Sequence, residues 1–261
     1  MKLKKPITTI VIIFSITLIL LALYSFIDYK FVIFGYELKK SGIRSMFEKS
    51  EDDLAFSDSI NTKKNDSIKA PPPRVLDTNK QKILLIGDSM VEGLMFPFVD
   101  YADFNGHQLF PVIWYSSSSK AFGTSDTLRY YIKKFKPTYI IMALSSNELF
   151  VSDIQTRDVY VKRILKQADT LKFVWIGPPN WKKDTGINDL ILKFCGKDRY
   201  FPSKDLKFDR ANDGAHPTRQ SSRTWADKIA KWITEESRYP IILNKPDKPS
   251  KKTPNATLMT L

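Results

Sequence analysis

The side chains with the most specific chemistry lie in three short polar segments. Ser89 and Asn147 each follow an apolar run, and Asp213 and His216 are three residues apart near the C-terminal part of the chain. A serine hydroxyl is a weak nucleophile that needs a base within hydrogen-bond reach. An imidazole oriented by a carboxylate is such a base, and an asparagine amide can donate a hydrogen bond to an oxyanion. These residue types together indicate nucleophilic acyl chemistry.

Each segment also has an ordinary structural interpretation. Ser89 in Gly-Asp-Ser can be a turn residue, Asn147 can cap a helix, and Asp213 can be a solvated loop carboxylate beside an unrelated histidine. The choice of base is narrower, because the chain contains only two histidines. His107 lies in a turn ahead of a candidate strand, at the amino edge of the expected sheet, which leaves His216 as the base.

Apolar runs of strand type alternate with stretches of helical spacing. The expected strands are 82–87, 109–115, 139–144 and 173–177, and the expected helices are 91–104, 125–135, 151–168, 186–194 and 219–236. This alternation predicts a parallel sheet covered by helices on both faces. Sites in such sheets form at the carboxyl ends of the strands. Ser89 and Asn147 both occupy that edge.

In this order and context the segments resemble the GDSL/SGNH hydrolase family. Gly87-Asp88-Ser89 is similar to its first block, Asn147 to its third, and Asp213 with His216 to its last. The resemblance covers residues 80–237. It implies an α/β fold, a three-layer α/β/α flavodoxin-like parallel sheet of SGNH type. An ordinary α/β-hydrolase would carry G-x-S-x-G, and Val91 stands where its second glycine belongs.

The resemblance also implies a role for each residue. Ser89 would be the nucleophile, His216 the general base and Asp213 its orienting acid. The Ser89 N–H, the Asn147 amide and a second-block N–H would form the oxyanion hole.

The chain departs from the family pattern in two blocks. Ser145 and Glu148 replace the Gly and Asp of the third block, G-x-N-D, so the local turn can differ. The second block normally supplies a glycine, and here Ser116-Ser117-Ser118-Ser119 follows the strand. The backbone donor would then be Ser116 or Ser118.

Other candidate residues have two interpretations. Asn180 and Trp181 follow a strand end and either line a sugar-binding cleft or belong to a packed loop. Trp225 and Trp232 are seven apart on the last expected helix, which favours the core. Asp209 competes with Asp213 as the orienting acid, but Asp213 has the family spacing.

Composition limits the remaining possibilities. The net charge is +13, from 41 basic and 28 acidic residues, without a basic stripe interleaved with stacking aromatics, so no nucleic-acid partner is expected. The single cysteine, Cys195, excludes an internal disulfide. The sequence has no Cys/His cluster for a metal, and no cofactor is expected.

The N-terminal part differs in character from the rest. Residues 7–27 carry no charge and as a helix would span about 30 Å, enough for a bilayer core. Lys2, Lys4 and Lys5 precede them, which predicts a cytoplasmic N-terminus and an extracytoplasmic body. A cleaved signal peptide is the alternative. We expect a cytoplasmic stub and transmembrane anchor at 1–28, a juxtamembrane segment and linker at 29–79, the hydrolase-like domain at 80–237, and a disordered basic tail at 238–261.

Three functions fit these expectations. The first is a serine esterase that removes acyl groups, chiefly acetyl, from an envelope or exported carbohydrate, or from a small ester. The second is an O-acyltransferase that uses the same triad to acylate a glycan. The third is a non-catalytic envelope protein that binds glycan.

Overall fold

The computed structural model describes residues 12–15, 17, 32–33, 36–37 and 74–259. The chain divides into two compact units, at residues 1–72 and 73–261. In the first unit the described elements are helical residues around 12–15 and a short antiparallel pair, β1 (Val32–Ile33) with β2 (Tyr36–Glu37). Most of the expected anchor at 7–27 and of the linker at 29–79 lies outside the described residues. Among the described residues, none belongs to a helix with the length and apolarity needed to cross a membrane.

The second unit is built around a parallel sheet of six strands, all paired in parallel, in the order β7-β6-β5-β3-β4-β8. Without β8 this is the flavodoxin-like order 2-1-3-4-5. Its strands are β3 (Lys82–Gly87), β4 (Gln108–Ile113), β5 (Tyr139–Ala143), β6 (Lys172–Ile176), β7 (Tyr200–Phe201) and β8 (Thr257–Leu258). The predicted parallel α/β sheet is therefore confirmed.

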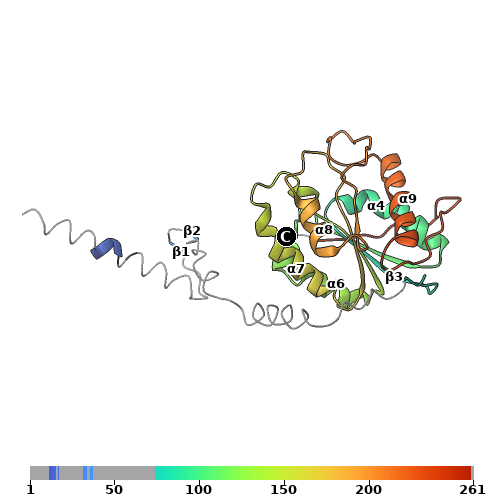
Figure 1. Cartoon of the computed structure of the whole chain (residues 1–261), viewed down its shortest axis with the longest axis horizontal. Coiled ribbons are helices and arrows are strands. Elements are labelled where there is room, and N and C mark those ends of the chain that lie inside the picture. The colour runs from blue at the N-terminus through green and yellow to red at the C-terminus, as the bar shows by residue number, and fades with distance from the viewer. Residues whose placement is uncertain (1–11, 16, 18–31, 34–35, 38–73, 260–261) are drawn as a thin grey trace, which may run out of the picture. The chain divides into compact units, whose positions relative to one another are not determined.

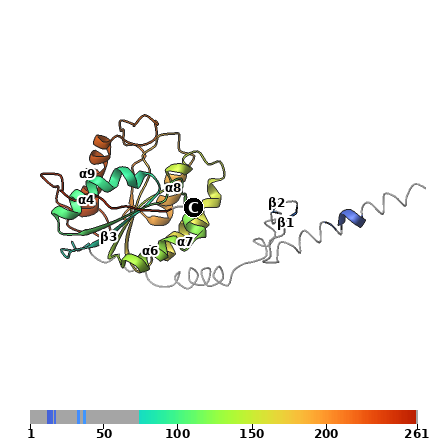
Figure 2. The same ribbon diagram turned by 180° about the vertical axis from the view of Figure 1, so that it is seen from behind.

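Helices cover both faces of this sheet (Figures 1 and 2). One face carries α4 (Met90–Phe104) and α9 (Arg219–Glu235). The other carries α5 (Ser119–Thr124), α6 (Thr127–Phe135), α7 (Asp158–Gln167) and α8 (Ile187–Cys195). A short 3₁₀ turn at Ile154–Arg157 replaces the first part of the helix expected at 151–168, and another at Ser146–Glu148 precedes it.

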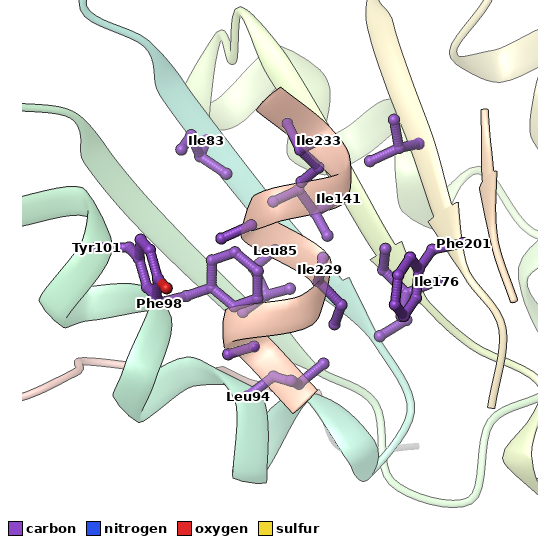
Figure 3. Packing of buried hydrophobic residues seen from close by; sticks show 14 of the residues in the cluster. Ile83, Leu85, Leu94, Phe98, Tyr101, Ile141, Ile176, Phe201, Ile229 and Ile233 are labelled. Carbon is purple, nitrogen blue, oxygen red and sulfur yellow. The ribbon is translucent and has the colours of Figure 1, made fainter. Parts of the chain in front are cut away.

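The alternation of side chains along each strand divides the core into two layers. In β3, Ile83 and Leu85 face α4 and α9, whereas Leu84 and Ile86 face the opposite helices, and all four side chains are fully buried. Figure 3 shows Leu85 with Phe98 and Ile229 of the first layer. A strand buried on both faces reads as a continuous apolar run, which is why β3 was predictable.

Helix α9 begins and packs as its sequence predicts. The Thr218 side chain accepts the N–H of Ser221 at 3.2 Å and caps the helix. Trp225 and Trp232 are 1% and 6% exposed, so both belong to the core as expected. Helix α4 packs closely against α9 at Gly93, where a Cβ would lie 2.6 Å from the Ser222 Oγ.

The segment after α9 is part of the sheet and core, which differs from the expected disordered tail at 238–261. Ile241 is fully buried and Leu243 is 5% exposed, both in the layer beneath α4 and α9. Strand β8 pairs with the carboxyl end of β4. The prolines and lysines of this segment suggested disorder, but Ile241 and Leu243 enter the core, and protein groups bond the carbonyls of Pro240, Ile241 and Ile242.

Replacement of Ile241 tests this assignment. Ile241→Ala should lower the free energy of unfolding by about 2–5 kcal/mol, because it leaves a cavity in a packed layer. Leu258→Ala is the matched control, since Leu258 is 58% exposed. Urea denaturation followed by circular dichroism measures both. Equal stability of Ile241→Ala and the parent chain would mean that this segment does not pack against the sheet.

Candidate active site

The candidate site lies at the carboxyl edge of the sheet, where β3 passes into α4. Ser89 is the residue before α4 and is partly exposed. Its Oγ lies 2.7 Å from the His216 Nε2, although the two residues are 127 positions apart in sequence. Packing of α4 against α9 brings them together, because Ser89 precedes one helix and His216 lies just before the other.

Asp213 orients the His216 ring from within the same loop. Its Oδ2 lies 2.6 Å from the His216 Nδ1, and its Oδ1 accepts the backbone N–H groups of Ala215 and His216 at 2.8 and 3.0 Å. A carboxylate can only accept, so the proton lies on Nδ1, and Nε2 accepts from the Ser89 hydroxyl. These hydrogen bonds, the backbone N–H of His216 first, hold the pKa of Asp213 well below its usual range.

The loop that carries this pair is a tight hairpin. Ala211 N–H donates to the His216 carbonyl at 2.8 Å, and Gly214 has a φ of 69°, a conformation that favours glycine. Arg210 donates to the Ala215 carbonyl at 2.7 Å and to the Asn180 carbonyl at 3.2 Å. The loop is therefore attached to the segment that follows β6. The side chain of Asp209 takes no part in these contacts, whereas its carbonyl accepts the Thr218 N–H.

Asp88 links the turn after β3 to the turn after β5. Its carboxylate is fully buried and accepts the Met90 N–H at 3.0 Å and both the N–H and the hydroxyl of Ser146 at 2.9 Å. Burial raises the pKa of Asp88 to about 6, while these hydrogen bonds act in the opposite direction. The Gly-Asp-Ser motif signalled Asp88 only as a neighbour of the serine. The structure adds its role in positioning Asn147, which follows Ser146.

Three sources of free hydrogen-bond donors lie near Ser89 and could bind an oxyanion: the Asn147 amide, the Ser89 N–H, and the N–H groups of Ser116 and Ser118. Asn147 uses one amide N–H on the Ser117 carbonyl, at 2.9 Å, and has a second. Ser117 and Ser119 use their N–H groups on the Trp114 carbonyl and on Glu148. Within residues 74–259, the N–H groups of Ser89, Ser116 and Ser118 make no hydrogen bond to the protein. Since β4 and β5 flank β3, these donors lie on both sides of the serine.

Glu148, which stands where the family motif has Asp, has a function that sequence reasoning missed. Its side chain is 2% exposed and accepts from the Ser119 N–H and hydroxyl, both at 2.8 Å, and from the Arg157 Nε at 2.9 Å. It thereby fixes the four-serine loop against the turn that carries Asn147. The one feature of the sequence that could have indicated this function is the position of an acidic residue directly after Asn147.

The remaining predicted residues have structural contacts. The Asn180 Oδ1 accepts from Asn188 at 3.1 Å, and the Trp181 indole N–H donates to the Ser146 carbonyl at 3.1 Å. These contacts favour the packed-loop interpretation of Asn180. His107 is 7% exposed and bonds the Ile242 carbonyl and the Gln81 N–H, far from Ser89 along the strand direction. In residues 74–259 no cluster of acidic, histidine or cysteine side chains could hold a metal ion.

No family model and no curated protein matches this chain. The chain is similar to two solved structures. One is described as a lipolytic protein of the G-D-S-L family from Desulfitobacterium hafniense, with 13% identity, a TM-score of 0.40, and coverage of 57% of this chain and 98% of that one.

A second similar structure is a family 3 carbohydrate esterase from Clostridium thermocellum. It has 14% identity, a TM-score of 0.43, and coverage of 59% of this chain and 94% of that one. The roles of the site residues are therefore argued from contacts within this chain.

Ser145 offers a test of the turn after β5. It replaces a glycine of the motif, has a φ of 92° and is fully buried, and its Oγ has no hydrogen-bond partner. Ser145→Gly removes a left-handed serine that costs about 1–2 kcal/mol and adds a smaller entropic penalty. We expect the free energy of unfolding to rise by about 1 kcal/mol, measured by urea denaturation. Ser146→Gly, which removes a hydrogen bond to Asp88, should lower it. A less stable Ser145→Gly protein would contradict this account of the turn.

Proposed function

We propose that this protein is a serine esterase of the GDSL/SGNH type that removes acyl groups, chiefly acetyl, from a carbohydrate. The observation that carries the proposal is the hydrogen-bonded series from Asp213 through His216 to Ser89, with distances of 2.6 and 2.7 Å. Three residues from two distant parts of the chain meet in the arrangement that activates a serine hydroxyl.

The reaction has two halves. The Ser89 Oγ attacks the ester carbonyl carbon while its proton passes to the His216 Nε2. The carbonyl oxygen becomes an oxyanion, which accepts from the free N–H of Ser89, the second Asn147 N–H and the backbone of Ser116 or Ser118. The bond to the sugar oxygen then breaks, and the imidazolium returns the proton to that oxygen. Water, deprotonated by His216, attacks the acyl-enzyme, and the acid leaves with Ser89 regenerated.

Solvent access favours hydrolysis over transfer to a sugar. The side chains of His216 and Asp213 are 37% and 51% exposed, so water can reach the base that must activate it. An acyltransferase gains from the exclusion of water at this step. Two further parts of the proposal are based on the N-terminal sequence. They are that the carbohydrate belongs to the cell envelope or is exported, and that the domain lies outside the cytoplasm.

Substitution of the proposed nucleophile and base tests the mechanism. Ser89→Ala and His216→Ala should each lower kcat on an aryl acetate by at least about 10³-fold, because either change removes the activated hydroxyl. Ser152→Ala is the control, since Ser152 is an exposed serine outside the site. Turnover by the parent chain that persists equally in all three variants would exclude this site. An inactive but folded parent would leave the glycan-binding alternative.

The role of Asn147 predicts a separate effect. Asn147→Ala should lower kcat about 10²–10³-fold with little change in KM, because the lost donor acts on the oxyanion rather than on the bound ester. Thermal unfolding measured in parallel reports any loss from the Ser117 contact. An unchanged kcat would assign the oxyanion to the backbone donors alone.

Mass spectrometry of products with and without an added oligosaccharide distinguishes hydrolysis from acyl transfer.

A further inference from the structure

Exposed aromatic side chains stand on both sides of Ser89. Tyr115 follows β4 and is 42% exposed, and Phe150 follows the Asn147 turn after β5 and is 52% exposed. Trp181, after β6, packs edge-on against Phe150 with ring centroids 5.9 Å apart. Strands β4 and β5 are the two neighbours of β3. At about 4.8 Å per strand, the carboxyl ends from β4 to β6 extend over about 14 Å, more than one small ester occupies.

One of these positions combines aromatic rings with a positive charge. The Lys182 Nζ lies 4.7 Å from the Phe150 ring centroid and 4.8 Å from that of Trp181. We call Phe150, Trp181 and Lys182 the cation–aromatic cluster. Lys182 is exposed and forms no ion pair with any residue in the described ranges. The nearby Asp184 carboxylate instead accepts N–H groups at the start of α8.

The cluster is connected to the nucleophile by hydrogen bonds. The Trp181 indole N–H donates to the Ser146 carbonyl at 3.1 Å, and Ser146 donates twice to Asp88, the residue before Ser89. On the other side, the Tyr115 hydroxyl donates to Glu92 at 3.0 Å, which fixes that ring against the first turn of α4. Both aromatic positions are therefore held relative to Ser89 by structured contacts.

The chemistry of these positions indicates a ligand. Exposed aromatic rings present an apolar face that can pack against the C–H face of a sugar ring, and an unpaired ammonium binds carboxylate. A small ester needs neither. We propose that the site takes an extended, O-acylated glycan that carries carboxylate groups. The cation–aromatic cluster binds this polymer on one side of the scissile ester and Tyr115 binds it on the other. This inference rests on the proposed function.

The test compares three substrates with the full chain: an aryl acetate, acetylated polygalacturonate and acetylated xylan. Phe150→Ala and Lys182→Gln should each lower kcat/KM on acetylated polygalacturonate about tenfold, mainly through KM, because one charged or stacking contact contributes on the order of a tenfold change. Activity on the aryl acetate should stay within about twofold of the parent. Lys197→Gln, an exposed lysine ahead of β7 at the opposite edge of the sheet, is the matched control and should change neither.

Several outcomes would overturn the inference without affecting the esterase proposal. In the first, the parent cleaves the aryl acetate but neither polymer. In the second, the parent cleaves both polymers and Lys182→Gln leaves kcat/KM on each unchanged. In the third, the variants lose kcat/KM equally on all three substrates. Calorimetric titration with unacylated polygalacturonate requires no turnover. Binding by the parent that weakens about tenfold in Lys182→Gln supports the inference even for an inactive enzyme, and no binding contradicts it.

Discussion

The buried Asp88 carboxylate is the constraint on which the rest of the site depends. It adds side-chain hydrogen bonds from Met90 and Ser146 between the turn that presents Ser89 and the turn that presents Asn147, beyond the pairing of β3 with β5. A buried carboxylate is costly unless donors surround it, and here every group that it contacts donates. The arrangement therefore holds Ser89, the proposed nucleophile, close to the turn that carries Asn147, the proposed oxyanion donor.

A second carboxylate extends this unit to the third strand end. Glu148 takes donors from Ser119 and Arg157 and so holds the four-serine loop after β4. The family motif has glycine and aspartate where this chain has Ser145 and Glu148. In this chain Ser145 adopts a left-handed conformation with a φ of 92°, and Glu148 is the acidic acceptor. The longer side chain is accommodated by the buried contact with Arg157, which screens its charge.

Much of the sheet could be predicted from the sequence because its strands are buried on both faces and read as continuous apolar runs. The meeting of Ser89 with His216 followed from topology: both belong to the carboxyl edge, and the second histidine belongs to the amino edge. The contacts of Asp88 and Glu148 could not be predicted, since they depend on which donors long-range packing brings to a buried oxygen. The packing of the segment after α9 could not be predicted from its composition either. Its buried residues, Ile241 and Leu243, are few, and the prolines and lysines around them are typical of a disordered segment.

The close approach of α4 and α9 affects how the contact between Ser89 and His216 forms. Asp213 and His216 form their pair within one loop, whereas the Ser89 contact depends on two helices that start side by side and touch at Gly93 and Ser222. Gly93 lies about one helical turn beyond Ser89, so the two helices are in close contact near the Ser89–His216 pair. A methyl group at position 93 would come within 2.6 Å of the Ser222 Oγ and 3.4 Å of its Cβ, so the Ser222 hydroxyl would have to turn away for α4 and α9 to keep their spacing.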